Sequence, residues 1–222
     1  MVAFLRLRAQ SEARLSRMPK LQEELRWSLP ALRNYCQKQL LEKLEESTIP
    51  LEELQEFRID CSLKDYRVEL EISREGERLN LNQASQEELE ALFEEAGIPP
   101  ERAAVMAESL LDWRDPDNEH RLNGAEKDFY APKGYAPRNA PLASLEEVTL
   151  IRGFDPYLFW FSPGLWQKVT IYTTSPKQAV YRAVFWIRYH GRTWCYLEIW
   201  KGLGPGGKIL HPFTLLPLSP SL

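Results

Sequence analysis

Two segments of the chain alternate between apolar and polar residues, and a block with helical periodicity lies between them. The first segment covers residues 66–72, and the second covers residues 179–200 with a turn at His190 and Gly191. Alternation with a period of two places successive side chains on opposite faces of a strand, so both segments predict strands with one buried face. The second segment also predicts a β-hairpin. Strands on both sides of a helical block indicate an α+β fold in which that block is inserted into a sheet domain.

The residues before the first alternating segment are typical of a long helix, because Leu, Glu, Arg, Gln and Lys dominate them. Apolar side chains recur there at steps of three and four residues, so they share one side of the helix. They are Leu21, Leu25, Leu29, Leu32, Tyr35, Cys36, Leu40 and Leu44. We expect this stripe to cover the sheet. Its first four leucines, Leu21, Leu25, Leu29 and Leu32, are also candidate contacts for partner proteins.

Two prolines lie within this helical segment. Pro19 and Pro30 each lack the N–H that a helical hydrogen bond needs, so we expect the helix to be kinked or interrupted there. Residues 48–50 (Thr-Ile-Pro) end the main run, and residues 51–57 are predicted to add a short turn of helix.

The inserted block begins with an extended stretch at residues 78–81 and changes period at Ser85. Ser85 and Glu88 have the spacing of a capping box, in which each side chain accepts a hydrogen bond from the other residue's backbone N–H at the start of a helix. Residues 97–100 (Gly-Ile-Pro-Pro) end this helix and begin a second one, because proline is favoured at an early helical position. We therefore predict two consecutive helices joined by a tight hairpin.

A loop rich in proline, at residues 115–141, follows the second helix. Ser144 and Glu147 then predict a third capped helix, and residues 155–160 predict one more short helix. This order suggests two domains. Residues 1–78 plus 166–222 are expected to form the helix and small antiparallel sheet, with a proline-rich tail from residue 208, and residues 79–165 are expected to form an inserted all-α domain.

The net charge excludes a general attraction to polyanions. Lys and Arg number 28 against 32 Asp and Glu, so the formal charge is −4 and the pI is about 5.6. A protein of this charge has no overall attraction to nucleic acid or to an anionic membrane. No run reaches the roughly 18 apolar residues that span a bilayer. The apolar start, residues 1–5, fits either a helix end or the last part of a longer hydrophobic segment.

Residues that commonly carry catalysis do not form a recognisable constellation. The three histidines, His120, His190 and His211, fall on a loop, a turn and the predicted tail. None has a Ser or Cys partner in a known motif, so we expect no enzyme activity. Cys36, Cys61 and Cys195 lack the spacing of a zinc site. Their number leaves open both a Cys36–Cys61 disulfide and three unpaired thiols.

Four consecutive blocks of the chain resemble the K-type minor pseudopilins of type II secretion systems. They read "LNLNQAS…L…LFEEAGI", "LLDWRDPDNEHRLNGAE", "YAPRNAPLASLEEVTLIRGF" and the final alternating hairpin. The resemblance runs from about Tyr66 to Phe154 and resumes in the hairpin. It implies a pseudopilin fold, with a long N-terminal helix on an antiparallel sheet and a large inserted helical domain.

The resemblance also implies a function and a location. Members of this family are non-enzymatic subunits at the tip of the periplasmic pseudopilus, where they join the I-type and J-type minor pseudopilins, and a hydrophobic helix anchors them in the inner membrane. The anchor helix is absent from this sequence, so we expect a soluble fragment or a truncated gene product. The region after Phe154 is shorter than in the family and lacks a second "NVN-T" type block.

The "LNLN-AS" opening also resembles helix-hairpin-helix modules that bind nucleic acid, which is the alternative function. Those modules use a Gly-x-Gly hairpin whose backbone N–H groups meet a phosphate. Here Pro99 stands where the second glycine would be, and it has no N–H to donate. No Lys or Arg lies between Arg78 and Arg102, whereas the same segment contains several glutamates. Because phosphate binding needs several cations, we expect no nucleic-acid partner.

The acidic loop after the second inserted helix is the candidate metal site. Asp112, Asp115, Asp117 and Glu126 are the candidate calcium ligands, because Ca²⁺ takes six to eight oxygen ligands from flexible loops. Calcium sites in the resembled family support this hypothesis, although the spacing is not that of an EF-hand. The alternative is a polar loop in which Asp117 and Asn118 bond to the local backbone.

Overall fold

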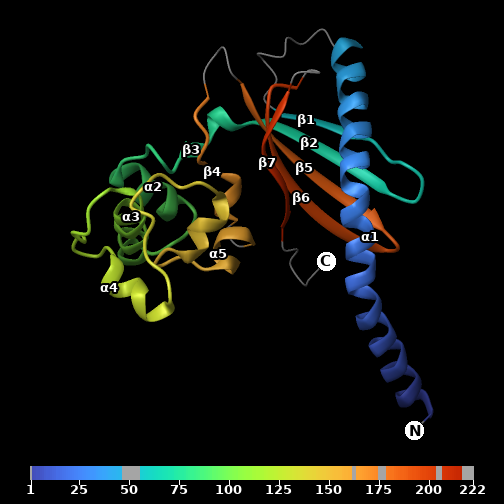
Figure 1. Cartoon of the computed structure of the whole chain (residues 1–222), viewed down its shortest axis with the longest axis horizontal. Coiled ribbons are helices and arrows are strands. Elements are labelled where there is room, and N and C mark those ends of the chain that lie inside the picture. The colour runs from blue at the N-terminus through green and yellow to red at the C-terminus, as the bar shows by residue number, and fades with distance from the viewer. Residues whose placement is uncertain (1, 47–55, 162–163, 175–178, 204–206, 217–222) are drawn as a thin grey trace.

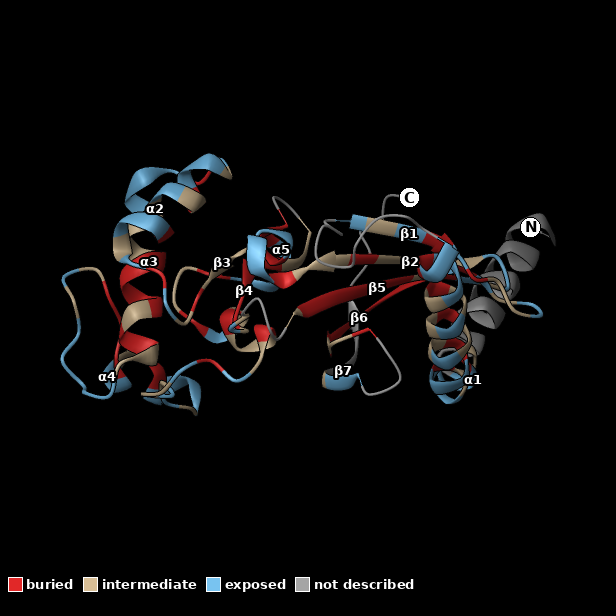
Figure 2. Cartoon of the chain, turned by 90° about the horizontal axis from the view of Figure 1, so that it is seen from above, coloured by how far each residue is buried: buried red, intermediate tan, exposed pale blue. Residues whose placement is uncertain are grey.

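The computed structural model describes the backbone of residues 2–46, 56–161, 164–174, 179–203 and 207–216. Within these ranges it describes the side chains from residue 20 to residue 210, residue 22 excepted. Over these residues the chain forms one long helix, an antiparallel sheet and a mainly helical insertion (Figure 1). The insertion and the long helix lie at opposite ends of the molecule, with the sheet between them (Figures 1 and 2). The expected α+β class is confirmed.

The main sheet has five strands in the order β1-β2-β5-β6-β7, and each neighbouring pair is antiparallel. The strands span Glu56–Asp60 (β1), Arg67–Arg74 (β2), Val180–Tyr189 (β5), Arg192–Lys201 (β6) and Lys208–Leu216 (β7). Both alternating segments are therefore strands, and β5 and β6 form the predicted hairpin. β2 pairs directly with β5 although the whole insertion separates them in sequence.

Two strands differ from the sequence-based expectation. The short helical turn predicted for residues 51–57 is wrong for residues 56–57, which belong to β1, and residues 51–55 lie outside the described residues. The tail predicted from residue 208 is instead strand β7 up to residue 216, and the rest lies outside the described residues. In both cases pairing supplies hydrogen-bond partners for a strand that would otherwise have an open edge, β2 or β6.

Helix α1 spans Val2–Glu46 as one helix of 45 residues. The interruption expected at Pro19 or Pro30 is wrong. Pro30 is exposed, as is Arg26 one turn before it, so the carbonyl group that loses its donor faces water rather than the core.

One core lies between α1 and the sheet. Leu25, Leu29, Leu32, Cys36, Leu40 and Leu44 of α1 are buried against Val68, Leu70 and Ile72 of β2 and against Ala183, Phe185 and Ile187 of β5. The predicted stripe therefore covers the sheet. A disulfide joins Cys36 of α1 to Cys61 just after β1, which decides between the two alternatives left open by the sequence, and Cys195 is a free buried thiol.

The insertion enters and leaves the sheet through a short parallel ribbon, β3 (Leu79–Asn80) paired with β4 (Val169–Thr170). Its helices are α2 (Gln86–Glu95), α3 (Pro100–Arg114), α4 (Lys127–Tyr130) and α5 (Pro156–Trp160). Its 3-10 helices are η2 (Glu75–Glu77), η3 (Ala131–Lys133), η4 (Leu145–Leu150) and η5 (Leu165–Gln167). The ribbon makes this part mainly helical rather than all-α.

The predicted helix caps have different outcomes. Ser85 and Glu88 form the complete capping box of α2. The third capped helix is wrong in type, because residues 145–150 form the 3-10 helix η4 and the Ser144 side chain makes no cap bond. Instead, Glu147 accepts a hydrogen bond from the backbone N–H of Ala143 at 3.0 Å. The short helix α5 is present, and Asp155 caps it through the backbone N–H of Leu158.

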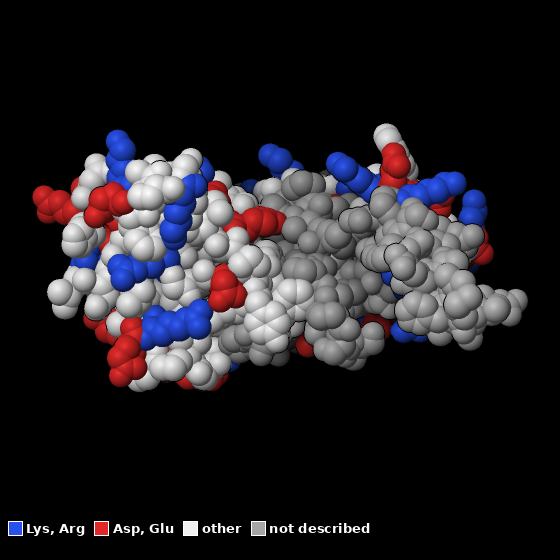
Figure 3. Space-filling view, turned by 90° about the horizontal axis from the view of Figure 1, so that it is seen from below, with Lys and Arg blue, Asp and Glu red and all other residues white. Residues whose placement is uncertain are grey.

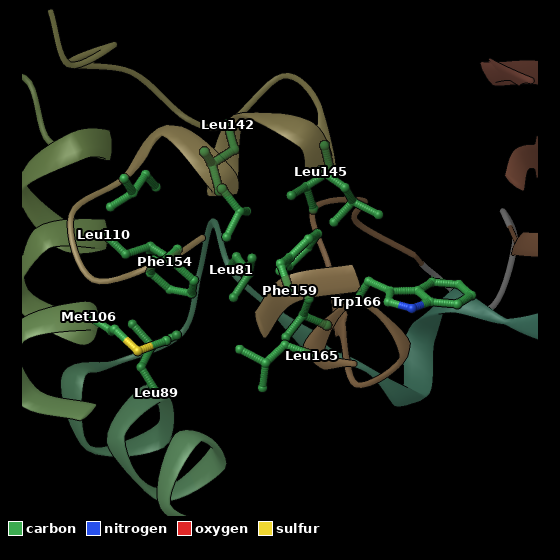
Figure 4. Close-up of a cluster of buried hydrophobic side chains, with 14 of the residues drawn as sticks. Leu81, Leu89, Met106, Leu110, Leu142, Leu145, Phe154, Phe159, Leu165 and Trp166 are labelled. Carbon is green, nitrogen blue, oxygen red and sulfur yellow. The ribbon is translucent and has the colours of Figure 1, made fainter. Parts of the chain in front are cut away.

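A second core fills the insertion and reaches the sheet. It gathers leucines and aromatic residues from α2, α3, η4, α5 and η5 (Figure 4). Val180, Val184, Cys195, Leu197 and Ile199, on the face of the sheet opposite α1, belong to the same cluster. Figure 2 shows the buried residues concentrated on α3, β5 and β6. The sheet is therefore covered on both faces, by α1 and in part by the insertion.

Candidate functional site

The acidic loop folds back onto the end of α3. Asp112 lies in the last turn of α3 and is fully buried, and Asp115 is the residue that ends the helix. Arg121, from the returning part of the loop, donates through Nη1 to Asp112 Oδ1 at 2.5 Å and to Asp115 Oδ2 at 2.6 Å. Its backbone N–H also points to Asp112, 3.1 Å from Oδ2. One arginine therefore holds two of the four predicted calcium ligands.

Gly124 lets the loop approach Asp112 closely. A Cβ atom at position 124 would lie 1.9 Å from Asp112 Oδ2. No side chain fits in that space, so the return of the chain from Arg121 to Glu126 requires a glycine here.

Glu126 is the member of the predicted set whose charge is not balanced. It lies just before α4 and is 2% exposed, and within the described part of the chain neither carboxylate oxygen has a hydrogen-bond partner. Burial raises the pKa of Glu126 to about 7, the charges of Asp112, Asp115 and Asp117 add to the rise, and the nearby backbone N–H of Lys127, outside normal hydrogen-bond geometry, opposes it. An ionised carboxylate in this position is costly unless a cation approaches it.

Asp112 and Asp117 have different surroundings. Burial raises the pKa of Asp112, and the hydrogen bonds and charge of Arg121 oppose the rise. Asp117 is exposed and accepts a bond from the backbone N–H of Glu119 at 2.9 Å, which is the local turn that the sequence offered as an alternative. Asn118 accepts from the Asn139 side chain instead.

The fit to a metal ion is partial. Among the described residues no three or more His, Cys, Asp or Glu side chains are arranged to hold a metal ion. The two oxygens of Glu126 are suitable ligands without a partner, whereas Asp112 and Asp115 are already bound by Arg121. Sequence reasoning found the acidic loop but gave no role to Arg121.

The predicted partner-binding leucines lie in the chain's own core. Leu25, Leu29 and Leu32 are buried against the sheet, and Leu21 packs beside them. The structure therefore corrects their assignment to a partner surface. The outward face of α1 carries Trp27 instead, which is 80% exposed. Its position two residues after Leu25 places it about 200° round the helix from the buried stripe, so periodicity would have found it.

The hairpin between α2 and α3 presents acidic groups. Gly97 has φ of +84° and Ile98 is buried, Glu94, Glu95 and Glu101 are exposed beside them in the sequence, and Glu87 and Glu88 are exposed at the start of α2. Lys168 pairs with Glu95 at 2.7 Å rather than standing free. On the face of the molecule in Figure 3, Lys and Arg are interspersed with Asp and Glu. This distribution does not favour a phosphate backbone.

Comparison with known proteins finds a family that is similar to the middle of the chain. Residues 67–160 match the family model described as "Type II secretion system (T2SS), protein K". Over these residues, which are less than half of its length, the chain is similar to the protein K family. The match begins at β2 and ends with α5, so it covers the insertion and the strand that leads into it. The resemblance seen in the sequence is thus confirmed.

Two curated relatives and one solved structure are similar to this chain. Type II secretion system protein K of Klebsiella pneumoniae is 39% identical over 70 residues, 31% of this chain and 22% of the relative. The protein of the same description from Dickeya chrysanthemi is 33% identical over 63 residues, 28% of this chain and 17% of the relative. The matched segments thus span about a fifth of the curated relatives.

The structural match extends over almost the whole fold. It is a chain of the crystal structure of the GspK-GspI-GspJ complex from the enterotoxigenic Escherichia coli type 2 secretion system. The TM-score is 0.63 at 14% identity, with 90% of this chain and 99% of that chain covered, so the two share a fold. None of these matches names a nucleic-acid-binding module. Within the described residues, no helix has the length and apolar character that crossing a membrane requires.

Proposed function

We propose that this chain is a non-enzymatic minor pseudopilin that acts at the tip of a type II secretion pseudopilus, where it is needed for assembly and for protein export across the outer membrane. The observation that carries the proposal is the protein K match over residues 67–160, within a fold whose long helix covers an antiparallel sheet. Such a subunit works by packing, without turnover. Complementation tests this role: a strain lacking its protein K regains secretion when a full-length gene carrying this region is supplied, and a failure despite normal protein levels contradicts it.

The proposed location is the periplasm, with inner-membrane anchorage of the full-length protein as the resemblance implies. The Cys36–Cys61 disulfide supports an oxidising compartment, because such bonds are rare in the reducing cytosol. Thiol labelling of protein taken from intact cells tests this. We expect Cys36 and Cys61 to be protected until a reductant is added, and labelling of both thiols without reductant contradicts the proposed compartment.

The proposed partners are the I-type and J-type minor pseudopilins. The family match and the fold shared with a chain of the GspK-GspI-GspJ complex support this proposal. On this chain the supporting feature is the outward face of α1, because an exposed tryptophan is typical of an interface centre. Trp27→Ala is expected to weaken association at least about tenfold, as central aromatic residues do.

Gel filtration and titration calorimetry with the two partners measure this association. Tyr157→Ala is the matched control, because Tyr157 is also an exposed aromatic residue but lies on α5 of the insertion, away from α1. If the wild-type chain does not co-elute with the partners, the partner proposal is wrong. If Trp27→Ala and Tyr157→Ala bind equally well, the partner surface is elsewhere.

Calcium binding at the acidic loop is a separate proposal. The unpaired oxygens of Glu126, with three aspartates close enough to raise its pKa, support it. Residues Asp112, Asp115, Asp117 and Glu126 would supply the oxygens, and Arg121 would have to release two of them. Calorimetry with calcium after chelator treatment should show binding that Asp115→Asn and Glu126→Gln weaken. Asp128→Asn, an exposed change close by, is the control. A flat wild-type titration ends this proposal.

A further inference from the structure

The insertion is joined to the sheet by two chain crossings, which we call the neck. Residues 75–80 leave the sheet after β2, and residues 165–171 return toward β5. The two crossings pair through β3 and β4, where Leu79 lies opposite Val169 and Asn80 lies opposite Thr170. Any change in the angle between the insertion and the sheet must pass through this neck.

Arg182 of β5 reaches both crossings of the neck. It points away from α1, since its neighbours Tyr181 and Ala183 belong to the core under that helix, and it is 1% exposed. Nε donates to Glu75 Oε1 at 2.5 Å, and one Nη donates to Glu75 Oε2 at 3.1 Å. The same Nη donates to the carbonyl oxygen of Val169 at 2.8 Å, and the other Nη donates to that of Trp166. One side chain thus ties the sheet to the outgoing crossing and to the returning crossing.

These bonds use most of the hydrogen-bonding capacity of the guanidinium group. Arginine has five N–H donors in a fixed plane. The four acceptor atoms that Arg182 contacts belong to η2, η5 and β4. Its partner Glu75 is itself fully buried in η2. A lysine would supply the same charge from one point and could not face all four acceptors at once.

Arg78 adds a second tie across the neck. It donates to the carbonyl oxygen of Gln167 at 2.9 Å and to Ser73 Oγ at 2.8 Å, so it connects the end of β2 to the returning crossing. Burial lowers the pKa of Arg78 to about 10, and the nearby positive charge of Arg182 contributes. Arg78 therefore keeps its charge at neutral pH.

Apolar contact alone would leave the angle between the two parts weakly defined. Val180 and Val184 of the sheet belong to the same cluster as Leu165 and Val169 of the neck. Burial of such surface opposes separation, but it is not directional and permits sliding. Hydrogen bonds from a planar guanidinium group are directional, and in some proteins a buried ionic group adds conformational specificity rather than net stability.

We propose that Arg182 is a positioning residue that locks the insertion in one orientation on the sheet and makes the two parts one rigid body. The role is conformational: without Arg182 the two cores remain folded, and their relative orientation becomes variable.

Distances between two spin labels test the proposal. Lys38→Cys on α1 and Glu94→Cys on α2 are exposed positions on the two parts, and the native cysteines are either disulfide-bonded or buried. In this background we expect one narrow distance distribution. Arg182→Lys should broaden it roughly twofold, since domains without a directional interface move relative to each other. Circular dichroism should show that the labelled protein remains folded with and without Arg182→Lys.

Arg58→Lys is the matched control, because Arg58 also lies on the sheet and pairs with Glu56 and Glu71 but is largely exposed. It should leave the distribution unchanged. Glu75→Gln keeps the shape of the partner and removes its charge, so it should broaden the distribution even if Arg182→Lys fails to fold. A distribution as narrow in both neck variants as in Arg58→Lys would overturn the proposal.

Discussion

Both cores consist of apolar side chains, but the core under α1 is reinforced by a disulfide and the core of the insertion by buried polar side chains. Under α1, leucines meet alternating residues of β2 and β5, and a disulfide ties the helix to the end of β1. In the insertion, Glu108 binds Asn123, Asp112 binds Arg121, and Asn82 holds Leu142 through both its backbone groups. The insertion therefore adds buried polar bonds to its apolar core, whereas the core under α1 adds a covalent link.

Paired truncations in the two cores should give the largest effects. Phe185 is buried under α1 and Phe93 is buried in the insertion, where its ring meets that of Phe154. Each change to Ala should cost about 3–5 kcal/mol of unfolding free energy, because it removes a buried ring and leaves a cavity. Hydrogen exchange should localise the loss, to β2, β5 and β6 for Phe185→Ala and to α2 and α3 for Phe93→Ala. Equal acceleration everywhere in both variants would show that the two cores unfold as one.

Removal of the disulfide should affect the sheet domain alone. Cys36 and Cys61 are 25 residues apart, and a cross-link of that span stabilises by about 3 kcal/mol through the unfolded chain. The Cys36→Ala/Cys61→Ala variant should lose this amount in urea unfolding, and a reductant should lower the wild type to a similar stability without changing the variant further. Faster exchange in α2 and α3 on reduction would contradict the separation of the two cores.

The stability of the insertion should depend on pH through Glu126. The folded pKa of Glu126 is about 7, above the ordinary 4.5, so the folded state binds more protons between these values. In chelator, stability should therefore fall as the pH rises from about 4.5 to 7, by roughly 2–3 kcal/mol, and level off above that. Glu126→Gln should remove this slope and be more stable than the wild type at pH 8. A wild type whose stability is flat across this range would place the pKa of Glu126 near its ordinary value.

The spacing of apolar residues in the sequence predicts the helices and strands that bury one regular apolar face. The leucine stripe of α1, strands β2, β5 and β6, and helices α2 and α3 follow from spacing alone, and the capping box of Ser85 follows from two residues. β1 and β7 were missed because they are short or interrupted by proline, and only their neighbours β2 and β6 make them strands. Local pattern does not contain that information.

Arg182 is a clearer example of what the local sequence pattern does not predict. In the alternation of β5 it occupies an outward polar position, which in isolation indicates a solvent-facing side chain. Only the return of the insertion buries it, through residues far away in the chain. The acidic loop is an intermediate case: its carboxylates were recognised, but the pairing of Asp112 and Asp115 with Arg121 required the fold of the loop.

The smallest predicted effect compares two serines with the same spacing to a glutamate. Ser85 accepts from the backbone N–H of Glu88 at 3.2 Å, and Glu88 accepts from the N–H of Ser85 at 2.8 Å, whereas the Ser144 side chain makes no cap bond. Ser85→Ala should cost about 1 kcal/mol, and Ser144→Ala should cost much less. Urea unfolding followed by a probe within the insertion measures both. Equal losses would mean that the three-residue spacing, rather than the hydrogen bonds of the folded chain, determines the cap. The buried polar bonds of the insertion would then contribute less than their geometry indicates.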